Sequence, residues 1–372
     1  MSDSLLVGLM SGTSIDAVDA VLVRITGESL QLIDCLEYPI SDDLKEEISQ
    51  LSHSGNNEIE RMGSLDRRLG QLFGDACLQL LQQADIDPSQ VRAIGSHGQT
   101  IRHCPPSASH SGQTAFTVQI GDPNTIAEIT GITTVADFRR RDIAAGGEGA
   151  PLVPAFHAAL FSDPSRSRAI VNIGGIANIS LLCDGQVSGF DSGPGNTLLD
   201  HWINARRNQA YDANGDWAAE GWVQESLLAR LLTHPYLQLP PPKSTGKEAF
   251  NLAWLDQQLS NTPDLSAVDV QATLAEFTAR TITDAIAISD QNIDEIYICG
   301  GGAANGDLMR RIRSRIGPAH LGTTTELGCD PTWVEAAAFA WLAFRRLEGL
   351  AGNVTQATGA SGERILGGVY TA

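Results

Sequence analysis

Residues 5–25 read LLVGLMSGTSIDAVDAVLVRI, which is an apolar run, a short polar turn and a second apolar run. Leu5–Met10 and Ala20–Ile25 have the apolar composition of buried strands, and Leu30–Tyr38 predicts a third strand. The turn between the first two, residues 11–14, contains a glycine and two hydroxyls within the sequence SGTS. Such a turn can bind phosphate, because glycine lets a ligand approach the backbone N–H groups. Glycine turns also end many strands without binding anything, so both interpretations stay open at this point.

The same pattern restarts in the middle of the chain. Ala169–Ile173 predicts a strand, and Gly174 and Gly175 predict a tight turn after it. The stretch VNIGGIANIS at Val171–Ser180 echoes VGLMSGTSID at Val7–Asp16, about 165 residues earlier. Two such turns, opening two similarly built halves, can face each other across a cleft and hold a triphosphate.

Helices and further strands alternate after each opening. Helical spacing of apolar residues predicts helices at Ile59–Ala84, Val270–Ser289 and Val334–Leu347. Val91–Ser96 and Glu295–Cys299 predict strands between them. Three strands followed by alternating helices and strands, twice over, indicate an α/β fold with mixed sheets in two domains. A length of 372 residues agrees with two domains.

Composition and charge indicate which kinds of binding partner this protein can have. Apolar residues make up 42% of the chain and charged residues 19%, which suits a globular protein with a core in each half. The net charge of −19 repels phosphate backbones and anionic lipid, so nucleic acid and membrane surfaces are not expected partners. The six cysteines are scattered, as in proteins of the reducing cytoplasm. No Lys or Arg precedes Arg24, so Leu5–Met10 lacks the basic flank of a signal peptide.

A third glycine motif lies near the C-terminus. Ile298–Asn305 reads ICGGGAAN, a strand end, a triple glycine and a helix start. It is not a dinucleotide fingerprint, because Asn305 stands where the third glycine of G-x-G-x-x-G would be. The glycines at positions 300–302 could let an adenosine lie flat on the backbone, or they could simply form a tight strand-to-helix turn.

One carboxylate lies at a predicted strand end. Phe190–Asn196 reads FDSGPGN, so Asp191 is followed by a turn that Gly193 and Gly195 keep open. An aspartate held there could deprotonate water or a sugar hydroxyl. It could equally accept hydrogen bonds from N–H groups of the turn.

Two other motifs resemble known binding sites but do not match their patterns. Pro242–Lys247 (PKSTGK) is not a P-loop, because the first glycine and the Ser/Thr after the lysine are missing and no strand precedes it. His97, His103 and His110 match no zinc-ligand spacing, so loop histidines, or one sugar contact from His97, are expected instead.

Taken together, these stretches resemble the anhydro-N-acetylmuramic acid kinases over essentially the whole chain. The two turns and the late glycine triplet correspond in order to the phosphate-1, phosphate-2 and adenosine motifs of actin, hexokinase and heat-shock chaperone ATPases. The colinear matches are Gly8–Asp16, Gly95–Thr100, Gln119–Asp122, Ala136–Arg139, Asp142–Pro154, Asn172–Asn178, Phe190–Asn196, Pro242–Phe250, Gly300–Asn305 and Trp333–Ala337.

The resemblance implies a fold and a reaction. The fold would be the two-domain actin/hexokinase-like, ribonuclease H-like architecture, with a mixed five-stranded sheet in each domain and an ATP and sugar cleft between them. The reaction would open the 1,6-anhydro ring with water and transfer the γ-phosphate of ATP to O6, which gives N-acetylmuramic acid 6-phosphate and ADP for peptidoglycan recycling.

The resemblance also implies roles for particular residues. Asp191 would be the catalytic base, and Glu335 would lie against the sugar together with His97, Gln99, Thr100, Asp122 and Arg139. The ATP-binding residues would be Gly12, Thr13, Ser14, Ile15, Asp16, Ala17, Val18, Asp19, Gly174, Gly175, Gly300, Gly301 and Gly302.

The wider superfamily carries an aspartate just before each phosphate turn, where this chain has Leu9 and Asn172. The candidates to meet Mg²⁺ are therefore Asp16, Asp19 and Asp191. The expected domains are 1–165 and 166–345, with a segment 346–372 that packs back on the first domain. A cytoplasmic homodimer would follow from the resemblance.

Two other classes of function compete with a kinase. A glycoside hydrolase needs two carboxylates around one bond and no phosphate turns. A non-catalytic ATP switch needs the nucleotide motifs but no sugar-side stretch such as Asp137–Gly149. Release of ADP that depends on the anhydro sugar separates the kinase from both.

Overall fold

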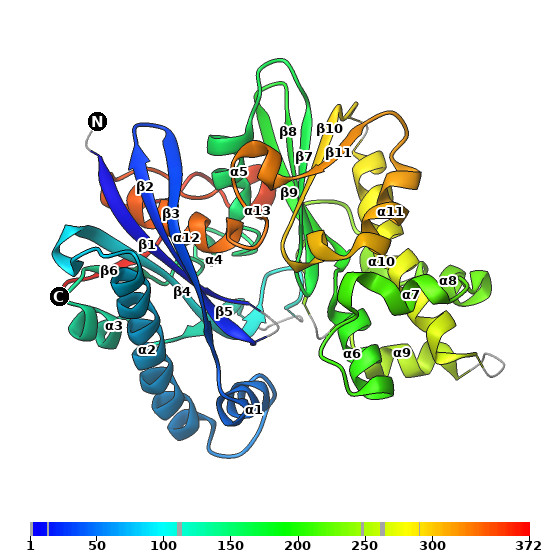
Figure 1. Cartoon of the computed structure of the whole chain (residues 1–372), viewed down its shortest axis with the longest axis horizontal. Helices are drawn as coiled ribbons and strands as arrows, with labels where there is room; N and C mark the ends of the chain where they lie inside the picture. The colour runs from blue at the N-terminus through cyan, green and yellow to red at the C-terminus, as the bar shows by residue number, and fades with distance from the viewer. Residues whose placement is uncertain (1–2, 13–14, 110–113, 247–248, 261–264, 290) are drawn as a thin grey trace. The chain divides into compact units, whose positions relative to one another are not determined.

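The computed structural model describes residues 3–12, 15–109, 114–246, 249–260, 265–289 and 291–372. The chain forms two compact units, Met1–Leu160 with Trp333–Ala372, and Phe161–Thr332 (Figure 1). The second crossing between units therefore precedes the helix that begins at Val334. This differs from the expected domain boundary at residue 345, because that helix packs on the first sheet and not on the second.

The first unit is built on a mixed sheet with strand order β12-β6-β4-β1-β2-β3, with β5 paired to β4. The opening strands β1, β2 and β3 are antiparallel neighbours, and β4 runs parallel to β1. This sheet has seven strands instead of the expected five, because β12 extends one edge and β5 pairs with the end of β4, at Gln99–Cys104. The strands are β1 (Ser4–Ser11), β2 (Ala17–Thr26), β3 (Ser29–Pro39), β4 (Val91–Cys104), β5 (Phe116–Ile120), β6 (Thr134–Ala136) and β12 (Gly368–Tyr370).

Helices cover both faces of this sheet. Alternate residues of a strand face opposite sides, so Val7 and Leu9 of β1 join the core under α2, while Gly8 faces α12. In α2, Leu65, Leu69 and Phe73 recur at helical spacing and are fully or almost fully buried. The helices of this unit are α1 (Asp42–Leu51), α2 (Glu58–Gln83), α3 (Pro123–Thr130), α4 (Arg140–Ile143), α5 (Val153–Phe161), α12 (Val334–Leu347) and α13 (Thr355–Thr358).

Two glycines let the backbone of α12 approach the sheet. A Cβ atom at Gly8 would collide with the carbonyl oxygen of Ala336, and one at Gly95 with that of Phe339. Any other residue at either position would push the helix away from β1 and β4. The glycines therefore fix the distance of α12 from the sheet.

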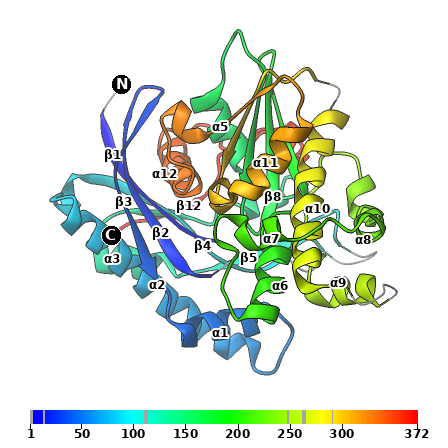
Figure 2. The same cartoon turned by 45° about the vertical axis from the view of Figure 1, so that its right-hand side comes forward.

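The second unit is built on a five-stranded sheet of order β11-β10-β7-β8-β9, as expected. Strands β7, β8 and β9 form the antiparallel opening, and β10 runs parallel to β7. Helices α10 and α11 cover one face of this sheet (Figure 2) and bury Ile282, Leu308 and Ile312 against it. The elements are β7 (Arg168–Ile173), β8 (Ile176–Cys183), β9 (Gln186–Pro194), β10 (Glu295–Cys299), β11 (His320–Thr323), α6 (Thr197–Arg207), α7 (Asp216–Glu220), α8 (Glu225–Leu231), α9 (Leu252–Leu259), α10 (Ala267–Ile288) and α11 (Gly306–Arg315).

The predicted α/β class and the repeated three-strand opening are confirmed. Two strands extend further than predicted: β4 continues through His97 to Cys104, and β9 continues through Asp191 to Pro194. The short α7 and α9 have no predicted counterpart, because tertiary packing of Trp217 and Leu255, and not a long periodic pattern, stabilises them. Among the helices in the described part of the chain, none has the length and apolar character to cross a membrane.

The contact between Gly8 and α12 can be tested by adding one methyl group. Gly8→Ala forces the α12 backbone away from β1, so we expect the free energy of unfolding to fall by about 1–3 kcal/mol in urea titrations. The control is Gly63→Ala on the exposed side of α2, where a Cβ meets nothing within 4 Å. It should stabilise the protein by about 0.5–1 kcal/mol, because alanine favours a helix over glycine. Equal stability of Gly8→Ala and the wild type would contradict the packing interpretation.

Candidate active site

The first predicted phosphate turn joins β1 to β2. The Ser11 hydroxyl donates a hydrogen bond to Gln99 Oε1 at 2.7 Å, and Gln99 Nε2 donates to the Gly12 carbonyl at 3.4 Å. Ile15 has a positive φ of 61° and its N–H donates to the same carbonyl at 3.3 Å. The predicted residues Thr13 and Ser14 lie outside the described residues. Gln99 was predicted on the sugar side, and its side chain holds the turn to β4.

Gly12 presents open space to a ligand. A Cβ atom built on it meets no atom within 4 Å. The side of Gly12 on which a side chain would stand is therefore open, as close approach of a phosphate to this turn requires.

Acidic side chains gather beside this turn. Asp19 on β2 lies directly opposite Glu37 on β3. Burial, and to a lesser extent the negative charges of Glu335, Glu37 and Asp16, together raise the pKa of Asp19 from 3.8 to about 7. Glu335 lies in the first turn of α12. Asp16 is exposed and pairs with Lys45 at 3.3 Å.

This concentration of carboxylates favours the binding of a cation. Among the described residues, no three Asp, Glu, His or Cys side chains converge into a metal site. Mg²⁺ is commonly held by one or two carboxylates together with substrate phosphates. Asp19 fits such a site, because it has carboxylate neighbours. It does not fit a site in which protein side chains alone surround the ion, because no three described ligand side chains meet there.

His97 and Arg139 hold one another inside the first unit. Arg139 Nε donates to His97 Nε2 at 3.0 Å, and His97 Nδ1 lies 2.9 Å from the Gly98 carbonyl. Burial and the Arg139 charge hold the pKa of His97 well below its usual range, so the ring is neutral. Its ring also stacks on Phe339 of α12, with centroids 4.6 Å apart. Both ring nitrogens of His97 have protein partners. His97 therefore stabilises this part of the unit, in addition to the predicted contact with the sugar.

The other sugar-side residues also have protein partners. Thr100 Oγ1 accepts from Gln119 Nε2 at 3.1 Å. Asp122 caps α3 by accepting from the N–H groups of Asn124 and Thr125. Burial opposes ionisation of Asp122, but these hydrogen bonds outweigh it and lower its pKa.

Asp142 was not predicted as a site residue, but its side chain fixes the segment that follows through hydrogen bonds. Its carboxylate is fully buried and accepts from Gly149 N–H, Asn353 Nδ2 and Thr358 Oγ1 at 2.9, 2.7 and 2.8 Å. The C-terminal segment thus fixes residues 142–149 within the same unit. Local sequence carries little signal for this, since two of the three partners, Asn353 and Thr358, lie more than 200 residues away in the chain.

The second predicted phosphate turn is tied to the start of α6. The carbonyls of Gly174 and Gly175 accept from the N–H groups of Asn196 and Thr197 at 2.8 and 3.1 Å. Gly195 N–H also donates to Gly175 at 2.9 Å. The turn after β7 and the turn after β9 are therefore one rigid structure.

The glycine triplet packs on the same structure. A Cβ at Gly300 would collide with Asn172 Oδ1, and one at Gly302 with the Ile173 side chain. Gly301 differs, because its Cβ would lie 3.7 Å from Asn196 Nδ2, an ordinary van der Waals distance. Tight packing explains Gly300 and Gly302 without a ligand, but it does not explain Gly301.

Asp191 lies on β9 and is 6% exposed. Its Oδ2 accepts from the Ser244 hydroxyl at 2.8 Å and from the Thr245 N–H at 2.9 Å. These donors fix the orientation of the carboxylate group. A β-bulge at Ser192 separates the pairing of Asp191 with Asn178 from that of Gly193 with Ala177. Bulges of this kind often aim side chains at active sites.

Lys243 is a neighbour that sequence reasoning missed. It is 5% exposed, and its ammonium donates to the Tyr236 and Leu237 carbonyls at 3.3 and 3.4 Å. Its negative neighbour Asp191 raises its pKa, but burial has the larger effect and lowers it. The available signal was a lysine inside a motif, PKSTGK, that fails as a P-loop.

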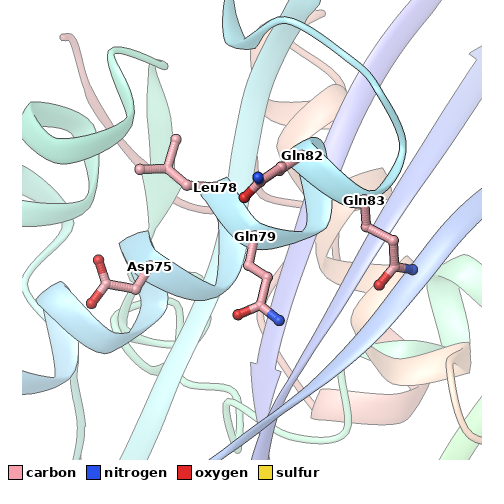
Figure 3. A pocket seen from close by; sticks show the side chains of 5 residues that line it. All are labelled: Asp75, Leu78, Gln79, Gln82 and Gln83. Carbon is pink, nitrogen blue, oxygen red and sulfur yellow. The ribbon is translucent and has the colours of Figure 1, made fainter.

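A surface recess of about 580 Å³ lies elsewhere, along the outer side of α2 (Figure 3). Its lining side chains come from this single helix, and one of them, Gln83, donates to Asp34 Oδ1 at 2.9 Å. It contains none of the predicted site residues. The lining residues are Asp75, Leu78, Gln79, Gln82 and Gln83.

Two α/β units that each open with a strand, a turn and a returning strand define the class of actin/hexokinase-like ATPases and sugar kinases. Within that class, the chain belongs to the anhydro-N-acetylmuramic acid kinase family, whose family model matches residues 4–372. The protein is therefore a kinase.

Relatives of this family match from end to end. The anhydro-N-acetylmuramic acid kinases of Shewanella halifaxensis and Shewanella pealeana are each 51% identical over 375 residues, covering 100% of both chains. The kinase of Shewanella loihica is 49% identical over 100% of this chain and 99% of its own. Among solved structures, the ROK hexokinase from Thermus thermophilus aligns with 91% of this chain and 99% of its own at 13% identity, with a TM-score of 0.38.

The raised pKa of Asp19 predicts a pH-dependent stability. Its folded pKa of about 7 exceeds the ordinary value of 3.8, so ionisation of this carboxyl destabilises the folded state increasingly as pH rises between these values. Asp19→Asn removes that ionisation. We expect its gain in melting temperature over the wild type to be larger at about pH 8 than at about pH 5. Asp75→Asn on the exposed side of α2 is the control for losing one carboxylate. A gain for Asp19→Asn that is the same at both pH values would contradict the assignment.

Proposed function

We propose that this protein uses ATP to phosphorylate O6 of 1,6-anhydro-N-acetylmuramic acid while water opens the anhydro ring. The products are N-acetylmuramic acid 6-phosphate and ADP, and the reaction serves peptidoglycan recycling. The observation that carries this proposal is Asp191, a carboxylate oriented by Ser244 and Thr245 on a bulged strand. Its place in a chain that belongs throughout to the kinase family supports the substrate.

In this reaction Asp191 is the general base. It takes a proton from water as the water oxygen forms a bond to C1. The C1–O6 bond breaks, and O6 keeps its electron pair and attacks the γ-phosphorus of ATP. ADP leaves with the electrons of the broken P–O bond. Phosphoryl transfer itself depends mainly on positioning and charge stabilisation.

ATP binding is assigned to the glycine turns of the two units. The segment Gly12–Asp19 and the turn Gly174-Gly175 would hold phosphates through backbone N–H groups. Open space at Gly12 supports the first of these assignments. The triplet Gly300–Gly302 would lie against the adenosine. Gly300 and Gly302 also hold this motif on the end of β7.

Mg²⁺ accompanies ATP in this proposal and neutralises phosphate charge. Among the three candidate carboxylates, Asp19 is favoured, because Asp16 is paired with Lys45 and Asp191 accepts from Ser244 and Thr245. Oxygen ligands of this type suit Mg²⁺.

Glu335 is assigned to the sugar. It is partly exposed at the start of α12, and its charge contributes to the raised pKa of Asp19. His97, Gln99, Thr100, Asp122 and Arg139 are assigned to the surroundings of the sugar, with the additional task of holding the strands and loops of this unit together.

We also propose a cytoplasmic homodimer that binds no nucleic acid and no membrane. The six cysteines are free thiols, as is usual in a reducing compartment. A net charge of −19 disfavours polyanionic partners.

Gly12→Val tests the first phosphate turn. The added side chain enters open space, so we expect the fold and melting temperature to change little. It should block the approach of phosphate, raise the KM for ATP and abolish turnover. Gly12→Ala should give a smaller loss of the same kind. A normal KM for ATP in Gly12→Val would remove residue 12 from the ATP site.

Asp191→Asn tests the general base. The amide oxygen can still accept from Ser244 and Thr245, so the KM values for sugar and ATP should change little. Turnover should fall by roughly 10²–10⁴-fold, which is the usual contribution of a positioned acid–base group. Ser244→Ala is the matched control, because it removes one hydrogen bond but keeps the carboxylate. Near-normal turnover of Asp191→Asn would show that the base lies elsewhere.

A further inference from the structure

A single segment of the second unit surrounds Asp191 from the open edge of β9. β9 is the last strand of its sheet, so its outer edge has no strand partner there. The Asp191 N–H donates to the Lys243 carbonyl at 3.2 Å, and the Tyr236 hydroxyl donates to the Asp191 carbonyl at 2.7 Å. The segment from Tyr236 to Thr245 therefore contacts both the backbone and, through Ser244 and Thr245, the carboxylate of Asp191.

The ammonium of Lys243 is buried inside this segment. It donates to two carbonyls of the same segment and lies 4.8 Å from the centre of the Tyr236 ring and 6.0 Å from that of Phe190. Burying an ammonium group is costly unless neighbouring groups compensate for its lost hydration. The carbonyls and ring faces compensate in part. Structural packing alone would be served by an uncharged side chain.

The charge of Lys243 acts on Asp191. The two groups interact electrostatically, and Asp191 raises the pKa of Lys243 against the larger lowering by burial. The interaction is mutual, so the ammonium favours the ionised form of Asp191. Burial of a carboxylate favours the neutral form instead. Asp191 is only 6% exposed, so its ionised form depends on favourable neighbours, which are the Ser244 and Thr245 hydrogen bonds and the Lys243 charge.

The described groups of the second unit around Asp191 can be named from each element. Strand β8 contributes the neutral amide of Asn178, which is directly opposite Asp191. Helix α10 contributes the Thr278 hydroxyl, which donates to the Gly195 carbonyl at 2.9 Å, and the Thr281 methyl group near Gly193. The segment beyond the edge of β9 contributes the Tyr236 phenol and the Lys243 ammonium.

We propose that Lys243 is a positioning residue for catalysis, whose buried positive charge keeps Asp191 ionised and whose hydrogen bonds hold the segment that orients the carboxylate. This inference rests on the proposed role of Asp191 as general base. It adds a residue that acts through Asp191 and touches neither water nor sugar.

The test compares pH–rate profiles of kcat/KM for the sugar in the full-length protein with ATP and Mg²⁺. Lys243→Met removes the charge and keeps the length of the side chain. Lys243→Gln also removes the charge but can still donate to a carbonyl. We expect the acid limb to move to higher pH by about one unit or more in both variants, which is the effect of losing a nearby opposite charge. Activity should recover towards the wild-type plateau as pH rises, and the KM for ATP should stay the same.

Tyr236→Phe is the matched control. It removes the hydrogen bond to the Asp191 carbonyl from the same segment and leaves the ammonium in place. We expect kcat to fall without movement of the acid limb. A purely structural role of Lys243 would lower kcat in all three variants with no movement of the limb, and that result would overturn the proposal.

Three further outcomes are decisive. A rise of the sugar KM alone would show that Lys243 contacts the substrate directly and would also overturn the proposal. Failure of both Lys243 variants to fold, by circular dichroism, would assign the charge to stability and count against it. The Asp191→Asn variant separates this inference from the proposed function. If that variant is active, the general base itself is wrong; if it is inactive while the acid limb of the Lys243 variants stays fixed, only the present inference fails.

Discussion

The close approach of α12 to strands β1 and β4 is the constraint on which the first unit depends. Gly8 and Gly95 remove the two side chains that would separate the helix backbone from the sheet. At that distance the first turn of α12 brings Glu335 to Asp19, and the next turn brings Phe339 onto His97. A shift of α12 would move Glu335 relative to Asp19 and Glu37, which lie on the sheet. The rigid sheet therefore determines the electrostatics beside the first turn.

In the second unit, different contacts hold the turn after the first strand. Here the turn after β7 is fixed by hydrogen bonds from the start of α6, and the glycine triplet after β10 fits onto Asn172 and Ile173. In the first unit a side chain fixes the turn, since Gln99 bonds to Ser11 and Gly12 at its start. Both turns follow the first strand of a sheet, and both are tied to a strand or helix far away in the chain. Preorganised backbone donors of this kind need little rearrangement when an anion binds.

Much of this fold could be read from the sequence, because the apolar runs that end in glycine turns at residues 11–14 and 174–175 are local patterns. The strand-end position of Asp191 was accessible for the same reason. The pattern of Val334–Leu347 predicts a helix but does not say which sheet it covers, so the domain boundary was misplaced. The burial of Lys243 and the packing of Gly300 and Gly302 arise from contacts between distant segments, and no local periodicity reports them. Charged residues are expected at the surface, so the sequence does not predict that Lys243 is buried.

The titration of Asp19 near neutrality has a calorimetric consequence. A carboxyl group with a pKa of about 7 holds its proton for a large part of the time under ordinary conditions. Any cation that binds this oxygen must displace the proton into the solution, so the binding equilibrium exchanges one positive charge for another. The apparent heat of binding would then depend on the ionisation enthalpy of the buffer, and the affinity would rise with pH up to the point where the carboxyl is fully ionised. If the nucleotide binds at the first turn as proposed, Asp19 would thus exchange its proton for the cation that accompanies the nucleotide.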